Sequence, residues 1–364
     1  MAFLFALVFL LAPGTLALDQ QEVLEEQAQS YGLEDLERAG EEYLGEIDLT
    51  GGMDVPSILQ ALGRKGVEAL AGVVKESVRS CVLLLVVTLL CGLAESMGTG
   101  AGGDPLKIST LAGALAITAV AVGDVNSLLS MGEEAIRSMQ SLGDVLLPAV
   151  SMTTAASGAP AAAAVKYSVT ILFSDFLIRL IRHLLIPLCY TFVAVNVAWA
   201  ALGNDGLKRM GGLLKWMIAT ILSVVLLIFI GYLNLSGVIS GSADAATIKA
   251  AKFTISNMVP VVGGVISDTA ETLLAGASLL RNTAGVFGML AVLGICLAPF
   301  LNLGIHYLMY KITAALAATV SGDGRITGLI ENLGSAFGLI LAMTGSCGVL
   351  LIVAMTSAVS AVAG

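Results

Sequence analysis

Long apolar stretches separated by short polar ones dominate this chain after its first 80 residues. Four of them are long enough, or nearly so, to cross a bilayer core, which takes about 20 residues: 81–97, 108–129, 216–235 and 333–363. Two longer blocks lie between them. In each block a proline-led stretch of small residues (147–165; 259–280) precedes a run of roughly 35 residues with a proline inside it (167–202; 284–320). The pattern predicts an all-α, polytopic membrane domain over 81–364.

The N-terminal part of the chain differs in kind. An apolar core followed by Thr15-Leu16-Ala17 within 1–18 is typical of a secretory signal sequence that is cleaved after Ala17, although an uncleaved anchor stays open. Residues 19–54 are polar, with apolar positions at loosely helical spacing, and are predicted to form a short acidic ectodomain. Residues 55–80 predict an amphipathic helix, which either lies on the membrane surface or packs on its own protein.

The membrane domain contains an internal duplication. Pro148 and Pro187 have counterparts in Pro260 and Pro299, in both cases 112 residues later. The predicted tandem units cover approximately 106–215 and 216–328, and the final span at 333–363 follows them. Internal duplication is typical of transporters and other membrane conduits.

Composition supports the membrane class. Hydrophobic residues make up 57% of the chain and charged residues 12%, against roughly 25% charged residues in soluble domains. The mean hydropathy is +0.93. The 41 glycines, together with abundant Ala, Ser and Thr, favour close helix packing in lipid. The five cysteines form no CxxC pattern and no Cys/His cluster, so they predict buried small apolar residues; no metal or other cofactor is expected.

Charge is distributed unevenly and orients the chain. The segment 19–54 holds 12 acidic residues and one basic residue, which accounts for the net charge of −9 and argues against a nucleic-acid partner. Lys208, Arg209 and Lys215 form the densest basic cluster of the membrane domain, so this loop is predicted to face the cytoplasm. With the acidic segment outside, each complex block must cross the membrane once or three times. The prediction is therefore six or ten spans, with repeats in parallel orientation.

Some polar residues fall inside apolar runs. Asp175 and Arg179 are four residues apart on one helical face, and Arg182 follows. Either they form an ion pair within a helix bundle or they line a conduit. Asn196 and His306 are expected to make interhelical hydrogen bonds or packing contacts, as is Asn302. No HExxH, GxSxG or Walker sequence is present, and the chain is predicted not to be an enzyme.

The segment 252–272, KFTISNMVPVVGGVISDTAET, closely resembles the signature stretch of the stage III sporulation protein AE family. The resemblance covers roughly 57–355 and includes Pro299, Lys311 and the Gly-Asp-Gly-Arg sequence at 322–325. It implies a multi-pass protein of the mother-cell membrane around the forespore. It further implies a channel complex with the other stage III operon proteins and stage II sporulation protein Q, required for late sigma-G-dependent transcription. Membrane lipid is the other expected partner, and a homo-oligomer stays open.

The signature stretch has a physical interpretation of its own. Pro260 lacks an N–H, and Gly263 and Gly264 allow a tight bend, so a helix break facing a water-filled cavity is one hypothesis, with Asp268 and Glu271 at its mouth. The alternative is an ordinary helix start, with Ser267 or Asp268 as the cap and Glu271 in the first turn.

Two other functions are compatible with the sequence. The duplication favours a stand-alone secondary transporter or permease subunit for a small solute, which would need a site near the bilayer midplane. The acidic segment 19–54 favours a membrane scaffold that recruits partners, which is compatible with a role in a channel complex.

Overall fold

The computed structural model describes residue 26 and residues 28–45, 53–98, 105–158, 160–258, 263–320 and 324–359. Only the backbone is described at 95–98, 105–109, 162, 234–258, 263–275 and 358–359. The elements are α3 (Leu33–Leu44), α4 (Val55–Gly98), α5 (Pro105–Ala156), α6 (Pro160–Leu180), the π-helical turn η1 (Ile181–Leu185), α7 (Ile186–Leu202), α8 (Asp205–Met258), α9 (Gly263–Ala317) and α10 (Gly324–Val359). These parts of the chain contain helices and no strands, as the sequence predicts.

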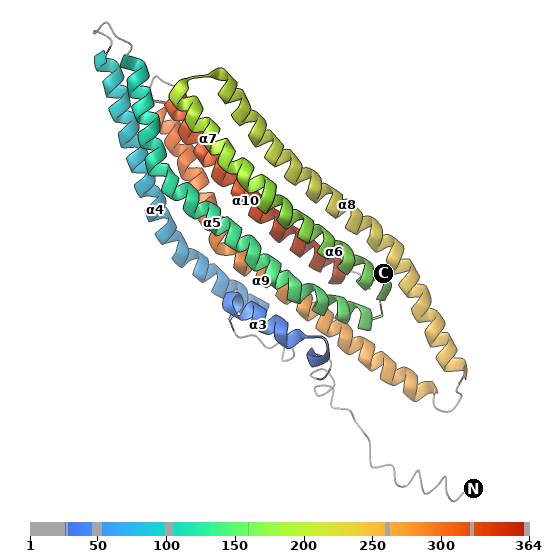
Figure 1. Cartoon of the computed structure of the whole chain (residues 1–364). Helices are drawn as coiled ribbons and strands as arrows, with labels where there is room; N and C mark the ends of the chain where they lie inside the picture. The colour runs from blue at the N-terminus through green and yellow to red at the C-terminus, as the bar shows by residue number, and fades with distance from the viewer. Residues whose placement is uncertain are drawn as a thin grey trace, which may run out of the picture.

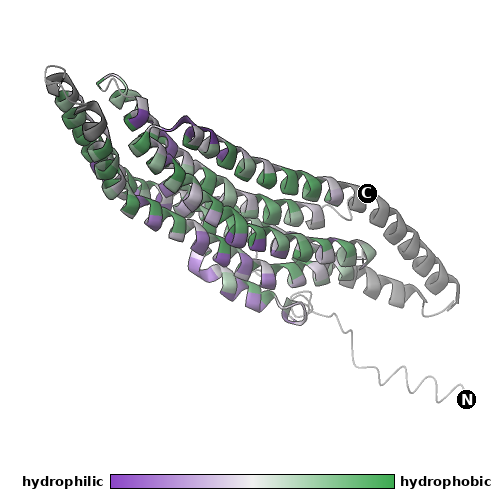
Figure 2. Cartoon of the chain, turned by 45° about the horizontal axis from the view of Figure 1, so that its top comes forward, coloured by the Kyte–Doolittle hydropathy of each residue, from purple (hydrophilic) through white to green (hydrophobic). Residues whose placement is uncertain are grey.

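The long helices lie side by side in a gently curved bundle, with α4 and α8 along its two edges (Figure 1). Within the part of the chain that the structure describes, six helical rods are long and apolar enough to cross a membrane: α4, α5, the continuous α6–η1–α7 rod, α8, α9 and α10. Of the two span counts that the charge pattern allows, this arrangement matches six. Figure 2 shows hydrophobic residues along most of these rods and hydrophilic residues gathered on α3.

The centre of the bundle is α10, which packs against α5, α6, α7, α8 and α9. In the most apolar 18-residue stretch of α10, 61% of the residues are buried inside the protein, whereas in the corresponding stretch of α8 only 17% are buried. Two glycines allow α9 to approach closely. A Cβ on Gly334 would lie 2.9 Å from the Cβ of Tyr310, and one on Gly338 would lie 3.0 Å from the ring of Tyr307. The glycine pair, four residues apart, therefore marks the α9–α10 crossing.

The amphipathic segment 55–80 is not a separate surface helix, because α4 runs without interruption from Val55 to Gly98. Part of its apolar surface packs on the protein, since Ile58 and Leu62 are buried against Leu290 of α9, whereas Leu59 and Val74 are exposed. Contact with lipid and packing on the protein therefore both stay open for this segment. An amphipathic face shows that a partner exists but not whether the partner is lipid or another helix.

The described parts of the proline-led stretches lie almost entirely within long helices. Residues from 147 to 156 extend α5, with Pro148 inside the helix, and Pro299 lies inside α9. Before Pro187 the helix widens into η1, where the N–H of Ile186 donates to the carbonyl of Ile181. Since a proline ring clashes with the carbonyl four residues earlier, the wider turn lets the rod continue through Pro187. The first block is therefore divided between the end of α5 and the α6–η1–α7 rod, and most of the described part of the second block forms α9.

The bundle has two chemically distinct ends. The basic end comprises the ends of α4, α7 and α9 and the starts of α5, α8 and α10 (Figure 1). There Arg325 donates to Thr110 Oγ1 at 3.3 Å, and Gly203, with φ of 69°, lies against the Arg325 side chain. The distal end comprises the ends of α5 and α10 and the start of α6. There Arg281 of α9 donates to Ser157, directly after α5, at 3.2 Å.

The helices are longer than a bilayer is thick. With 54 and 55 residues, α8 and α9 would each extend roughly 80 Å, against about 30 Å for the hydrocarbon core. The stretches without Asp, Glu, Lys or Arg are 216–243 in α8 and 282–310 in α9. Both lie nearer the basic end, so the charged remainder of each helix extends beyond the apolar band at the distal end.

Part of the acidic N-terminal segment is packed onto the bundle. Leu33 and Leu36 of α3 are fully buried, and a Cβ on Gly40 would lie 2.2 Å from the Phe287 ring of α9. Lys65 of α4 donates to the carbonyl of Tyr43, in the last turn of α3, at 3.3 Å. The predicted signal sequence lies outside the described residues, and the 112-residue repeat and the ectodomain boundaries stay predictions.

Candidate functional site

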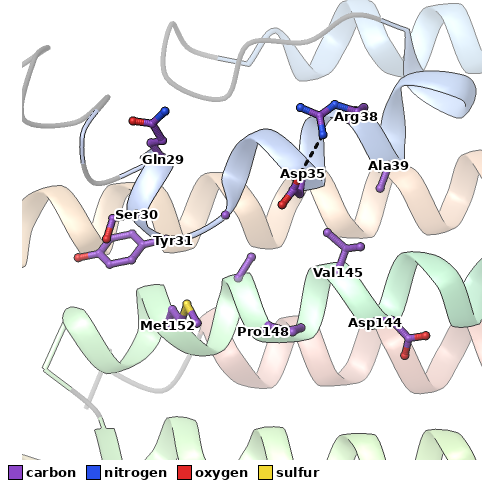
Figure 3. Close-up of a pocket in the computed structure, with 12 residues that line it drawn as sticks. Gln29, Ser30, Tyr31, Asp35, Arg38, Ala39, Asp144, Val145, Pro148 and Met152 are labelled. Atoms are coloured by element: carbon purple, nitrogen blue, oxygen red, sulfur yellow. Dashed lines mark hydrogen bonds and ion pairs between the residues drawn. The ribbon is translucent and has the colours of Figure 1, made fainter.

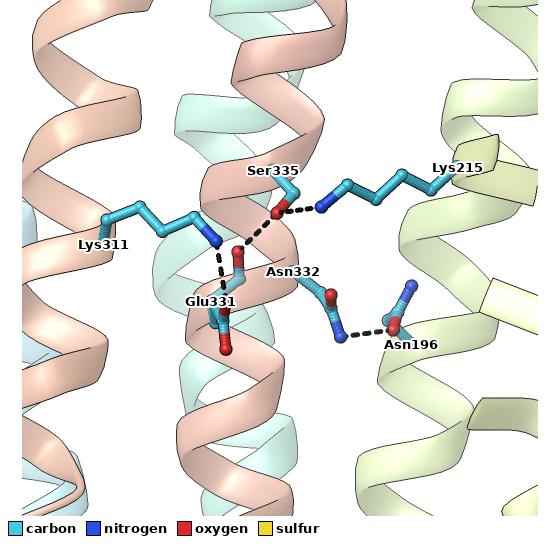
Figure 4. A network of polar contacts seen from close by, with 6 residues as sticks. All are labelled: Asn196, Lys215, Lys311, Glu331, Asn332 and Ser335. Atoms are coloured by element: carbon cyan, nitrogen blue, oxygen red, sulfur yellow. Dashed lines mark hydrogen bonds and ion pairs between the residues drawn. The ribbon is translucent and has the colours of Figure 1, made fainter. Parts of the chain in front are cut away.

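A polar network joins four helices near the basic end of the bundle (Figure 4). Asn196 of α7 is 3% exposed, and its Oδ1 accepts a hydrogen bond from Asn332 Nδ2 of α10 at 2.7 Å. Asn196 Nδ2 in turn donates to the carbonyl of Phe192 at 2.7 Å. Gly211 of α8 leaves room for this amide, because a Cβ there would lie 3.0 Å from Asn196 Nδ2. The interhelical bond expected of Asn196 is thus present.

Charged residues continue the network on α10. Glu331 accepts a hydrogen bond from Lys311 Nζ of α9 at 2.7 Å. Lys215 of α8 donates to the hydroxyl of Ser335 at 3.2 Å, and this hydroxyl donates to the carbonyl of Glu331 at 3.0 Å. The result is a chain of contacts from α8 through α10 to α9, with two cations near one carboxylate.

Sequence reasoning missed Glu331, Asn332 and Ser335 as partners. Their signal was available: three polar residues stand within five positions, just before and at the start of the apolar run of the last span. What the sequence lacks is the pairing, since Asn196 and Asn332 are 136 positions apart. Polar groups within a membrane bundle must find partners in neighbouring helices, and they are frequently functional.

The predicted group of Asp175, Arg179 and Arg182 lies along a cleft of 490 Å³ that Gln140 and His183 also line. Arg179 Nη2 and Asp175 Oδ2 are 3.3 Å apart, so the pair expected from the spacing exists. However, these side chains are 75% and 49% exposed. The expectation of a pair enclosed in the bundle is therefore wrong, and a conduit-lining role stays a prediction.

Arg182 lies in the π-helical turn and reaches a different helix. Its Nε is 3.5 Å from Glu133 Oε1 of α5, and Glu133 also accepts a hydrogen bond from Arg137 at 2.8 Å. The carboxylate of Glu133 thus forms ion pairs with two arginines, Arg137 and Arg182. Because π-helical turns frequently occur at functional sites, this junction of η1 and α5 is the second polar locus of the bundle.

The signature stretch, 252–272, includes the end of α8 and the start of α9. The helix α8 ends at Met258 and α9 begins at Gly263, so Gly263 and Gly264 open a helix whose first turns contain Asp268 and Glu271. An N-cap at Ser267 or Asp268 is wrong, because both residues lie inside α9. Pro260 lies outside the described residues, and the side chains of the other four candidate residues are not described. Their role at a water-filled cavity stays a prediction.

A larger cleft of 640 Å³ separates α3 from α5 (Figure 3). Tyr31 and the ion pair of Asp35 and Arg38, 2.9 Å apart, line it together with Asp144 and Met152 of α5. Burial raises the pKa of Tyr31. The cleft therefore combines both charges with apolar surface at the junction of the acidic segment and the bundle.

Other contacts in the described parts of the chain serve packing. His306 is 3% exposed, bonds the carbonyl of Asn302 at 2.8 Å and packs edge-on against Phe337. Asn302 bonds the carbonyl of Ala298 within its own helix, so it makes no bond to another helix here. All five cysteines are buried, and none of them forms a disulfide. Among the described residues, no group of three or more His, Cys, Asp or Glu side chains is placed to hold a metal ion.

Comparison with known proteins identifies relatives. The family model described as stage III sporulation protein AE matches residues 47–362. The Bacillus subtilis (strain 168) stage III sporulation protein AE is 25% identical over 247 residues, which cover 67% of this chain and 61% of the relative. The chain thus matches somewhat less than two thirds of that relative's length. No solved structure matches the chain significantly.

Proposed function

This chain belongs to the stage III sporulation protein AE family, and from that premise we propose that it is an integral membrane component of the channel complex between mother cell and forespore. The complex sustains late, sigma-G-dependent gene expression in the forespore. The match over residues 47–362 carries the proposal, because it includes all six long apolar helices. In this role the protein is a structural subunit and not an enzyme.

The topology that we propose places the basic end in the mother-cell cytoplasm and the distal end between the two membranes. Lys208, Arg209 and Lys215 support the first part by the positive-inside rule. The docking of α3 supports the second. Gly294 lies against Tyr43 of α3, and the 23 residues from there to Ala317 would rise roughly 35 Å, about the thickness of a hydrocarbon core.

Partners in this proposal meet the distal end. Because α5, α8 and α9 extend beyond the apolar band there, they offer helical surface to proteins in the intermembrane space. The acidic residues Glu34, Glu41 and Glu42 of α3 are exposed while its apolar face is docked. The stage II sporulation protein Q and the other stage III operon proteins are the partners that we propose for this surface.

A deletion of the gene in its spore-forming host tests the proposal. We expect engulfment to finish, a late sigma-G-dependent reporter to stay silent, and the forespore to shrink. Expression of the full chain in the mother cell should restore the reporter, whereas expression in the forespore alone should not. Normal late transcription in the deletion strain would overturn the proposal.

The alternative, a stand-alone transporter for a small solute, is favoured by the predicted duplication. It requires transport by the purified protein in vesicles without any partner. The two clefts described above involve charged side chains of α3, α5, α6 and η1, rather than a midplane site between the two predicted repeats. Solute uptake by vesicles that contain this protein alone would favour the transporter over the channel subunit.

A further inference from the structure

Two cations are buried at the distal end of the bundle. Lys166 of α6 is 7% exposed and Arg281 of α9 is 5% exposed. They lie in the same neighbourhood, because Arg281 bonds Ser157, whose hydroxyl donates to the carbonyl of Thr154, and Thr154 and Lys166 line one cavity. Two like charges that are removed from water in this way cost free energy unless counter-charge is supplied.

The described partners of both cations are neutral. Lys166 Nζ donates to the backbone carbonyl of Ser357, in the last turn of α10. Arg281 Nη1 donates to the hydroxyl of Ser157 at 3.2 Å and Nη2 to Asn282 Oδ1 at 3.3 Å, whereas its buried Nε has no partner. Within the described parts of the chain, no carboxylate pairs with either cation.

Two helix ends supply part of the missing negative charge. Lys166 lies at the C-terminal turn of α10, and Arg281 lies at Ser157, directly after α5. A helix C-terminus is equivalent to roughly half an elementary negative charge. The two ends together therefore offset about one of the two positive charges, and the described residues supply no group that compensates the other.

A small cavity of mixed, largely apolar lining adjoins Lys166. It has a volume of 20 Å³, and the hydroxyl-bearing residues Ser151, Thr154, Tyr167 and Thr170 line it together with apolar side chains. A cavity of roughly 10–15 Å³ on this measure already holds one water-sized particle. The space therefore suits a single small ion and excludes a phosphate group or an organic acid.

We propose that one small monovalent anion of the size of chloride binds Lys166 in this cavity at the distal end of the bundle, with Arg281, beside Ser157, adding positive charge next to it. The anion completes the charge compensation that the two helix ends begin, and it ties α6, α9 and α10 together where the bundle leaves the apolar band. From Arg281 to Ala317, α9 rises roughly 54 Å, so the site lies beyond a hydrocarbon core counted from the basic end. Ions from the extracytoplasmic solution reach this level without crossing the membrane.

The test measures thermal unfolding of the full-length protein in mild detergent. Chloride is exchanged for gluconate at constant ionic strength, and bromide serves as a second small anion. We expect chloride and bromide to raise Tm by on the order of a few degrees, with saturation, because a ligand that binds only the folded state stabilises it. Lys166→Met should abolish this response, and Arg281→Gln should weaken it at least about tenfold in apparent Kd.

A matched variant separates this site from general salt effects. Lys75→Met removes an exposed lysine of α4 and should keep the full chloride response. An equal chloride-dependent rise in Tm in Lys166→Met and Lys75→Met would overturn the proposal. A wild-type Tm that is the same in chloride and in gluconate would also overturn it. That second result would mean that Lys166 is neutral or that the cavity holds water.

A second measurement does not depend on the folding of a variant. The chlorine-35 resonance of chloride should broaden in the presence of the wild-type protein, and bromide should reverse the broadening by competition. An unchanged line width of the chlorine-35 resonance, at chloride concentrations that saturate the rise in Tm, would overturn the proposal.

Discussion

Near the start of α10, Lys311 donates to the carboxylate of Glu331. Near the end of α10, Lys166 donates to the backbone carbonyl of Ser357. At the basic end, cations and the carboxylate of Glu331 come from neighbouring helices, so the charges compensate one another within the chain. At the distal end, Lys166 and Arg281 face hydroxyls, an amide and helix ends. The first end is thus held by an ion pair within the chain, whereas the second has no such pair among the described residues.

Both ends rely on the α9–α10 crossing, and the largest effect is expected there. Gly334→Val would force a side chain against Tyr310 Cβ, at 2.9 Å, and towards the carbonyl of Tyr307, at 3.5 Å. Because neither backbone can move alone, we expect a loss of about 3 kcal/mol or more and a low level of membrane-inserted protein. Gly304→Val is the control, since a Cβ there meets nothing within 4 Å. Equal levels of the two variants would show that the crossing is not tight.

A second prediction concerns the buried hydrogen bond between Asn332 and Asn196 at the basic end. Asn332→Leu leaves the buried Oδ1 of Asn196 without its donor, and we expect a loss of about 2 kcal/mol in the free energy of unfolding. The double variant with Asn196→Leu should recover most of this loss, because no buried polar group is then left unpaired. Additive losses in a double-mutant cycle, measured by thermal unfolding in detergent, would contradict a direct bond.

The distal half carries a docked helix, α3, that the basic end lacks. Gly40→Val would place side-chain atoms on the fully buried Phe287 ring and should release α3 without unfolding the bundle. Hydrogen exchange at 33–44 should accelerate at least about tenfold, equivalent to about 1.4 kcal/mol of docking free energy. Gly63→Val on α4, where a Cβ meets nothing within 4 Å, should leave this exchange unchanged. Unaltered protection in Gly40→Val would mean that α3 docks by other contacts.

The smallest effect is expected where a pair is exposed. Asp175→Asn removes the partner of Arg179, but these side chains are 49% and 75% exposed, so we expect a loss below about 0.5 kcal/mol. Glu133→Gln should cost more, since Glu133 is half-buried and serves Arg137 and Arg182 together. A larger loss for Asp175→Asn would indicate that the cleft beside it is enclosed in the assembled complex.

Sequence periodicity predicted the class, and the structure matches the lower of the two predicted span counts. The bonding of Asn196, the pairing of Asp175 with Arg179 and the burial of the cysteines followed from residue type and spacing. These properties are local, because a spacing of four residues fixes a helical face whatever lies outside it. The exposure of Asp175 did not follow, since that depends on which neighbouring helix covers the face.

The sequence by itself determined that this chain is an all-helical membrane protein of the stage III sporulation protein AE family, with a basic loop and an acidic N-terminal segment. Only the tertiary structure decided that α4 is continuous, that α3 docks against Phe287, and that Lys311 meets a carboxylate while Lys166 does not. The reason is physical. The composition and the hydrophobic periodicity of a segment indicate which of its surfaces must be buried away from water. Which helix covers that surface depends on packing between residues that are far apart in the chain.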